Sequence, residues 1–133
     1  MHILTLLIFL NLHNPLQKLT HSGKCGVTPD KAYSQNVLGR NVGYYVEIKN
    51  ESEKEFDAIE WEAFFYDNFD ELLETRPGSW SSGNIIKPCK PQETIKDLDM
   101  VWVKKATKVI IKIRRVHFTD GTTCGSKSKK SQK

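Results

Sequence analysis

The chain has 133 residues, which is enough for one folded domain but not for two. Its hydrophobic share of 38% is ordinary for a globular protein and excludes a chain that is disordered throughout. The net charge is +4, and without the four lysines of residues 126–133 the basic residues equal the 16 acidic ones in number. The body is therefore neutral, which argues against nucleic-acid binding, because such domains carry a basic face.

The last eight residues contain lysine, serine and glutamine but no apolar side chain. Because such a segment cannot contribute to a core, residues 126–133 are predicted to form a basic, disordered tail that favours solubility. An alternative role for these lysines is weak attraction to an anionic membrane or polymer through charge alone.

An apolar run occupies residues 3–12 near the start of the chain. It is too short to cross a bilayer as a helix, which takes about 20 residues, but it has the length of the apolar region of a signal peptide. Residues 1–22 are therefore predicted to be a signal peptide, and no other segment predicts a transmembrane span. The expected location is extracytoplasmic, meaning periplasmic, cell-surface or secreted. The alternative is a cytoplasmic interaction domain on which the run packs as a strand.

Residues 23–40 have no sustained periodicity and are predicted to form a linker or an edge strand near Val37. Apolar and polar residues alternate from 42 to 49, which predicts a half-buried strand, and a polar turn follows it. We expect the β-sandwich domain to span residues 41–125.

A second long strand is predicted over residues 56–67. Its core face is expected to carry the apolar set Ile59, Trp61, Ala63 and Phe65. Glu60 and Glu62 fall on the opposite face, where we expect them to oppose basic residues of a neighbouring strand. The far end is apolar on both faces, so a loop or another chain is expected to cover it.

Short strands are predicted at 72–75, 80–86 and 93–98, with a break at 76–79 because Pro77 and Gly78 favour a turn. Residues 99–106 fit either an extended strand or a loop. The last long strand is predicted at 107–118, with a β-bulge near Arg114 where the apolar parity changes. Residues 122–124 can begin a hairpin partner. Six or seven short strands without a helical segment indicate an antiparallel β-sandwich.

Three segments resemble FxLYD-type and related immunoglobulin-like domains of secreted or envelope bacterial proteins. They are an apolar strand end with its Asn-x-Ser turn (46–52), the Phe-Phe-Tyr-Asp motif (64–67), and a Lys-Pro turn (87–89). The sequence departs from the family at Cys89, where glycine is usual, and in its long basic final strand. The resemblance implies an all-β, immunoglobulin-like antiparallel β-sandwich of about seven strands. It also implies an extracytoplasmic setting and no known activity.

The three cysteines, Cys25, Cys89 and Cys124, have no spacing typical of a metal site. No metal and no cofactor are predicted. In an exported chain one disulfide is expected, and we predict that it joins Cys89 to Cys124. Two alternatives stay open at this point: a bridge from Cys25 to either of the others, or no disulfide.

The sequence contains no recognisable catalytic constellation. Glu60 and Glu62 are predicted to form a solvated, ion-paired strip instead of an acid–base pair. His117 is the only histidine in the predicted folded body. We therefore predict a non-enzymatic domain. The alternative is a thiol-dependent or hydrolytic enzyme that uses Cys124 with His117.

Aromatic residues exceed what one core face requires, so some are expected at the surface. An exposed aromatic cluster typically marks a partner surface. The residues predicted for it are Tyr66, Trp80 and Trp102. The sequence thus favours a binding or structural module whose partner is an unknown protein or envelope component.

Overall fold

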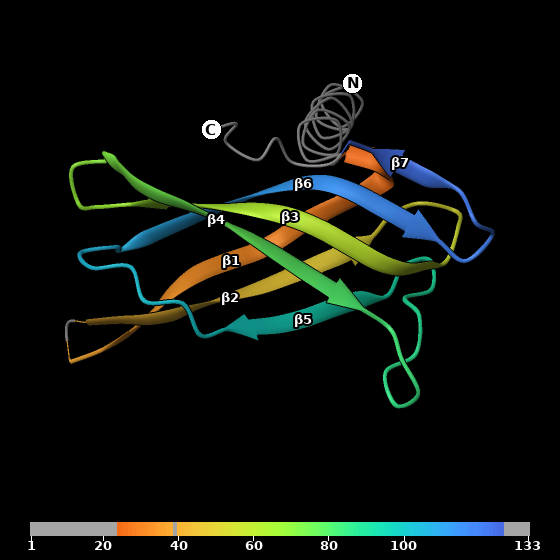
Figure 1. Ribbon diagram of the computed structural model, residues 1–133, viewed down its shortest axis with the longest axis horizontal. Coiled ribbons are helices and arrows are strands. Elements are labelled where there is room, and N and C mark those ends of the chain that lie inside the picture. Colours follow the sequence, from red (N-terminus) through yellow and green to blue (C-terminus); the bar gives the residue numbers. More distant parts are fainter. Residues whose placement is uncertain (1–23, 39, 127–133) are drawn as a thin grey trace, which may run out of the picture.

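The computed structural model describes residues 24–38 and 40–126 of the chain, and this part is all-β apart from one short 3-10 turn, η1. Figure 1 shows the seven strands, most of which run along the length of the molecule. The elements are η1 (Lys24–Gly26), β1 (Val27–Val37), β2 (Arg40–Asn50), β3 (Phe56–Tyr66), β4 (Leu72–Ser81), β5 (Thr94–Asp99), β6 (Lys108–Phe118) and β7 (Thr123–Gly125).

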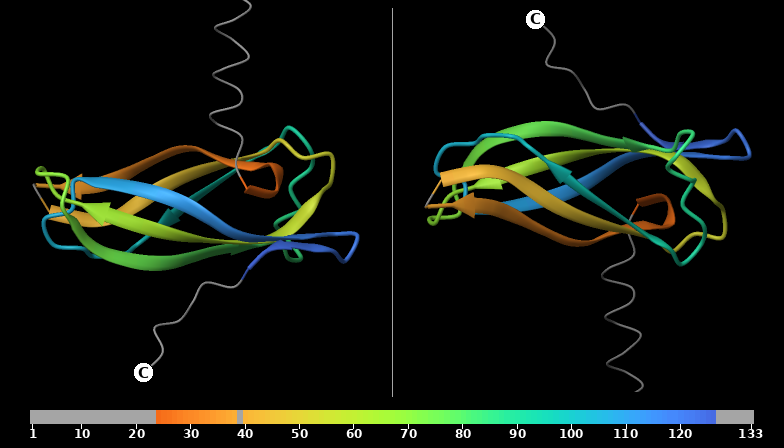
Figure 2. Two further views of the ribbon diagram at one scale, coloured as in Figure 1. Left: turned by 90° about the horizontal axis from the view of Figure 1, so that it is seen from above. Right: turned by 90° about the horizontal axis from the view of Figure 1, so that it is seen from below.

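The strands form two antiparallel sheets that pack face to face, which confirms the predicted sandwich of about seven strands. One sheet has the order β1-β2-β5 and the other the order β4-β3-β6-β7. The two layers are separate in the views of Figure 2. The β1–β2 hairpin therefore lies in one sheet and the β3–β4 hairpin in the other. Immunoglobulin-like sandwiches divide their strands between two sheets in this way.

Residues predicted for the signal peptide and residues 127–133 of the predicted tail lie outside the described residues. The described residues contain no helical segment with the length and hydrophobicity of a membrane span.

The central strands β3 and β6 of the four-stranded sheet supply the most buried apolar side chains, five each, because each alternates between buried and outward positions. The predicted core face of β3 is buried as expected, with Trp61 at its middle. The opposite sheet contributes Tyr44, Val46 and Ile48 from β2. Burial of these large side chains supplies the main driving force for folding, at roughly 25 cal/mol per Å² of apolar surface.

A chain of hydrogen bonds crosses this core from one sheet to the other. Trp61 Nε1 on β3 donates to the Tyr44 hydroxyl on β2 at 2.9 Å, and that hydroxyl donates to Asp99 Oδ2 on β5 at 3.1 Å. The buried indole N–H and phenol thereby both have partners, which removes the cost of burying them unpaired. The chain fixes how Trp61 lies between the sheets.

Strand β4 is continuous where the sequence predicted a break at residues 76–79. Pro77 is tolerated because β4 is the outermost strand of its sheet, so an absent amide need not interrupt a ladder. Gly78 lies opposite Trp61, and a Cβ built there would approach Trp61 Nε1 to 2.1 Å. The glycine therefore makes room for the indole instead of ending the strand.

The predicted bulge is confirmed on β6. The register with β3 steps from Glu60↔Arg115 to Trp61↔Ile113, which leaves Arg114 as the extra residue. Arg115 binds both carboxylate oxygens of Glu60, at 2.6 and 2.9 Å, and Arg114 pairs with Glu62. The two glutamates thus belong to an outward ion-paired strip, as expected.

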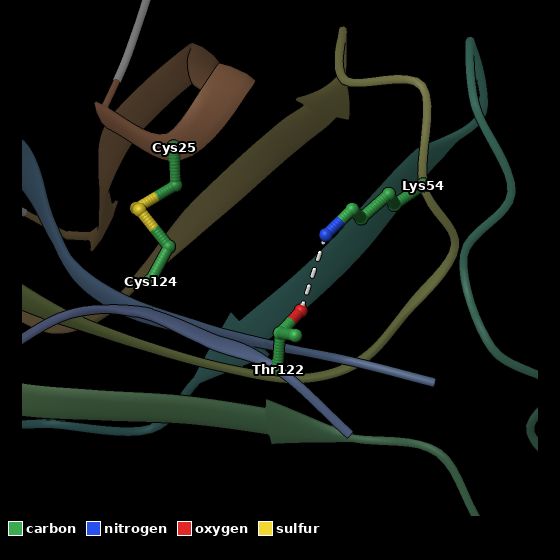
Figure 3. Close-up of a disulfide and its surroundings, with 4 residues drawn as sticks. All are labelled: Cys25, Lys54, Thr122 and Cys124. Atoms are coloured by element: carbon green, nitrogen blue, oxygen red, sulfur yellow. Dashed lines mark hydrogen bonds between the residues drawn. A yellow bond between two sulfur atoms is a disulfide. The ribbon is translucent and has the colours of Figure 1, made fainter. Parts of the chain in front are cut away.

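Residues 27–37, for which linker and edge strand were both open, form the full-length edge strand β1. Just before it, Cys25 is bonded to Cys124 of β7 (Figure 3). The predicted Cys89–Cys124 bridge is therefore wrong, and the alternative that included Cys25 is the one observed. Beside the disulfide, Lys54 donates to the Thr122 hydroxyl at 3.3 Å.

Strand order explains why Cys89 cannot reach Cys124. The backbone of Cys89 pairs with that of Phe56 on the β4 side of β3, whereas Cys124 lies on β7, beyond β6. Two strands intervene, so the cysteines are about 14 Å apart at the usual strand spacing, well beyond disulfide reach. The sequence could not reveal this separation, because it depends on which strands are neighbours.

We predict that the double variant C25S/C124S has a lower free energy of unfolding than the wild type by about 4 kcal/mol, because the bridge closes a loop with a separation of 99 residues. Denaturant unfolding would measure the difference. A reducing agent should destabilise the wild type but leave the double variant unchanged. Non-reducing peptide mapping that joined Cys89 to Cys124 would contradict the assignment.

We predict that Gly78→Ala lowers the free energy of unfolding by about 1–3 kcal/mol, because the new methyl group would overlap the Trp61 ring and the Tyr44 hydroxyl. Gly83→Ala is the matched control, since nothing lies within 4 Å of a Cβ at that position. Equal stability of the two variants would show that Trp61 is not fixed over Gly78.

Candidate binding surface

Exposed apolar side chains gather at one end of the sandwich. Three connections lie there: the β1–β2 hairpin tip at Leu38, the β3–β4 turn (67–71) and the β5–β6 loop (100–107), at the left in Figure 1. Leu38 is 99% exposed, Phe69 85% and Trp102 66%. Large apolar groups so exposed at neighbouring positions typically mark an interaction site.

Two of these connections form a basic and apolar surface that we call the hairpin–loop patch. We define it by seven exposed residues of the hairpin tip and the β5–β6 loop: Val37, Leu38, Arg40, Met100, Trp102, Lys104 and Lys105. The patch contains three cations and no acidic residue. The adjacent β3–β4 turn differs, because it carries Asp67, Asp70 and Glu71.

Asn41 ties the two halves of the patch together. This side chain is only 2% exposed, and its Oδ1 accepts a hydrogen bond from the Val103 amide at 3.0 Å. Its Nδ2 donates to the Gly43 carbonyl at 3.0 Å and to the Ser34 hydroxyl at 2.5 Å. A buried amide with all its partners satisfied holds loop and hairpin in one geometry.

The β5–β6 loop is anchored by its apolar residues, which makes its outward residues project. Val103 and Ala106 are buried, and the Ala106 amide donates to the Val103 carbonyl at 3.2 Å. Trp102, just before the first anchor, and Lys104, between the two anchors, are exposed. Lys105, also between the anchors, adopts a left-handed φ of 69°. The exposed indole therefore sits on a fixed support, which lowers the entropy lost on binding.

A hollow of about 500 Å³ opens within the patch and is lined by Arg40, Asn41, Trp102, Lys104 and Lys105. An indole face can cover an apolar or planar group, and guanidinium and ammonium groups bind phosphate or carboxylate. The arrangement therefore suits an anionic ligand with an apolar portion.

The structure does not bring together the three aromatic residues predicted for a partner surface. Trp102 is in the patch, whereas Trp80 is partly buried near the opposite end, edge-on to Phe56 with ring centroids 5.6 Å apart. Tyr66 is half-buried at the end of β3 and pairs with Leu72 of β4. Only Trp102 of the three therefore belongs to the surface described above.

Sequence reasoning missed Leu38, Arg40, Met100 and the two loop lysines. Leu38 and Arg40 fell in a segment for which a linker was open, and residues 99–106 were assigned to neither strand nor loop. A signal was present in Val37-Leu38 followed by glycine and arginine, which is a tight turn between two extended segments. Even if this hairpin had been recognised, the sequence would not have shown that its tip lies beside the β5–β6 loop, because that depends on the strand order.

The structure gives the alternative Cys124–His117 dyad no reacting thiol. Cys124 is bonded to Cys25, and His117 Nδ1 lies 2.6 Å from Asp57 Oδ1. A half-open hollow of about 220 Å³ lies beside His117 and is lined also by Glu60, Arg115 and Thr123. Among the described residues, no group of three or more potential metal ligands is assembled.

Cys89, the remaining thiol, is buried, and burial raises its pKa to about 11, with Glu93 adding to the shift. We predict that the folded, oxidised protein reacts slowly with iodoacetamide at pH 7, because the thiolate is the reactive species and almost none is present that far below the pKa. Mass spectrometry would follow the labelling. In urea the same thiol should react at the rate of a free cysteine. Fast, stoichiometric labelling of the folded protein would contradict this prediction and favour a thiol enzyme.

Comparison with known proteins identifies the fold and no more. No family model matches the chain, and no curated protein sequence matches it significantly. A hypothetical protein from Peptoclostridium difficile 630 is 11% identical with a TM-score of 0.53, over 78% of this chain and 87% of that one. A DUF1425 family member from Shewanella sp. pv-4 is 13% identical with a TM-score of 0.47, over 66% and 76% of the two chains.

The first of these similarities supports the β-sandwich fold alone, because identity is too low to carry a function. No enzymatic activity is assigned to either protein. Neither confirms the narrower resemblance to FxLYD-type domains.

Proposed function

We propose that this chain is an exported, non-enzymatic binding module, and that the hairpin–loop patch is the surface that contacts its partner, a protein or an envelope component. One observation carries the proposal: Trp102 is exposed on an anchored loop and lines a hollow with three cations, and none of the patch residues is acidic. Tryptophan and arginine are the side chains that most often dominate binding energy at an interface.

The energetics of the patch agree with this role. Leu38 and Trp102 leave large apolar surfaces in water, and covering such a side chain contributes about 1.5–3 kcal/mol. The Asn41 contacts have already ordered the loop and the hairpin, so a partner need not order them again. A purely structural loop would gain nothing from presenting these side chains outward.

Two independent features support export. The Cys25–Cys124 disulfide is of a kind that persists in oxidising compartments and is rare in the cytoplasm. The apolar run at residues 3–12 has the length expected of a signal peptide. The resemblance to secreted and envelope domains points in the same direction, and all three weigh against the cytoplasmic alternative.

The experiment that tests the proposal measures retention of the protein on envelope fractions isolated from its host. We predict that Trp102→Ala lowers the retained fraction about tenfold or more, because a large exposed apolar surface of the patch is lost and tryptophan often dominates binding energy. Ile85→Ala is the matched control: Ile85 is 94% exposed, in the β4–β5 loop at the other end. Circular dichroism would verify that both variants fold.

The outcome decides between this surface and the lysine tail. Retention that is unchanged in Trp102→Ala but lost when residues 127–133 are removed would replace the proposal with charge attraction by the tail. The intact mass of the host protein tests export separately: a mature form lacking about the first 22 residues and found outside the cytoplasm is expected. A full-length, reduced protein in the cytoplasm would contradict export.

A further inference from the structure

We infer that the partner of the hairpin–loop patch is an anionic phospholipid bilayer, into whose interface Leu38 and Trp102 insert. This inference rests on the function proposed above and names the occupant of the same surface. Three properties of the patch support a lipid surface: the shape of its apolar groups, the placement of its charges, and the position of its tryptophan.

Two apolar groups of the patch, Leu38 and Met100, protrude, and Trp102 is the apolar group that also lines the hollow described above. Leu38 is at the tip of the β1–β2 hairpin in a left-handed conformation (φ 51°), and its side chain is 99% exposed. Met100 and Trp102 project from the adjacent loop. A folded protein partner would need a matching hollow for each protrusion, whereas acyl chains rearrange around separate side chains. Insertion of such tips resembles the shallow burial by which interfacial segments bind membranes.

The charges of the patch match an anionic leaflet. Arg40, Lys104 and Lys105 lie beside the apolar tips, where long basic side chains can reach headgroups while their stems contact apolar surface. Asp99, the acid adjoining the patch in sequence, accepts a hydrogen bond from Tyr44 in the core. Each basic residue near an anionic surface is expected to strengthen binding about fivefold.

Trp102 lines the hollow of the patch together with the three cations. Tryptophan favours the level of a membrane at which headgroups begin. Its ring is apolar and its N–H is polar, so both are satisfied where acyl chains meet headgroups. The loop anchors Val103 and Ala106 hold it there without dependence on the lipid. The patch therefore arrives at the surface in its bound shape.

The neighbouring β3–β4 turn supplies an internal contrast at the same end of the molecule. Phe69 is exposed too, but acids surround it: Asp67 Oδ1 accepts from the Phe69 amide at 2.8 Å, and Asp70 pairs with Lys108. These carboxylates would be repelled by anionic headgroups. We therefore expect the molecule to dock tilted, with the hairpin and the β5–β6 loop inserted and this turn left in water.

The test uses the protein as its host processes it, mixed with phosphatidylcholine vesicles with or without phosphatidylglycerol, and measures co-sedimentation. Binding that requires phosphatidylglycerol is expected. Leu38→Ser should weaken it about tenfold because a buried leucine side chain is lost. The triple variant R40S/K104S/K105S should weaken it about a hundredfold.

Matched controls test whether the location of the substituted residues in the patch matters, or only the loss of an apolar or basic side chain. Phe69→Ser removes an equally bulky exposed group at the same end, and Ile85→Ser removes one at the other end. The triple variant K87S/K90S/K96S removes three exposed lysines outside the patch. None of these is expected to change binding more than about twofold, and loss of binding in all of them alike would overturn the proposed site.

Tryptophan fluorescence gives a readout of insertion. Trp61 is buried and Trp80 is partly buried, so Trp102 is the tryptophan that lipid can reach. Phosphatidylcholine with brominated acyl chains should quench the emission of the bound wild type, and Trp102→Phe should abolish that quenching. Binding without quenching, lost in R40S/K104S/K105S but intact in Leu38→Ser, would overturn insertion in favour of headgroup attraction.

The two proposals can fail separately. If vesicles do not bind but retention on envelopes still requires Trp102, the lipid inference is overturned and the binding module stands, with a protein or polymer as its partner. If removal of residues 127–133 alone abolishes vesicle binding, the patch is not the lipid site. If every patch variant keeps both vesicle binding and envelope retention, the lipid inference and the proposed binding surface are both overturned.

Discussion

The Tyr44 hydroxyl is the point on which the rest of the sandwich depends. It accepts from Trp61 in one sheet and donates to Asp99 in the other, so it links three strands with two hydrogen bonds. The indole can lie at that depth only because β4 presents Gly78 beneath it. Packing of the largest core residue, the continuity of β4 and the start of the β5–β6 loop at Asp99 are therefore coupled through one oxygen.

Polar groups that are buried and satisfied define both the core and the candidate binding surface. Asn41 does for the hairpin and the loop what Tyr44 does for the sheets: it pairs a backbone amide of one element with the carbonyl of another. Exposed apolar residues need such support, because without it a loop that carries tryptophan would collapse onto the nearest apolar surface. The fixed loop and the exposed ring therefore both depend on the buried Asn41 amide together with the buried anchors Val103 and Ala106.

Local patterns predicted the strands well because period-two alternation directly reports one buried face. The core face of β3 and the bulge at Arg114 could both be read from parity alone. The β4 break and the Cys89–Cys124 bridge failed for one reason: each depends on neighbours in space. Pro77 is acceptable only in an outermost strand, and Cys124 can meet Cys25 only once β1 and β7 are placed. The hairpin–loop patch, assembled from two distant segments, lay beyond sequence reasoning in the same way.

The position of the disulfide has a mechanical consequence. Cys25 precedes β1 and Cys124 lies within the last strand, so almost the whole sandwich is inside one covalent loop. Tension applied between residues 24 and 126 would pass from one backbone end to the other through the sulfur atoms. The ladders of hydrogen bonds between strands would then carry almost none of the load, and the end that bears the patch, opposite to the bridge, would keep its shape while the chain is pulled.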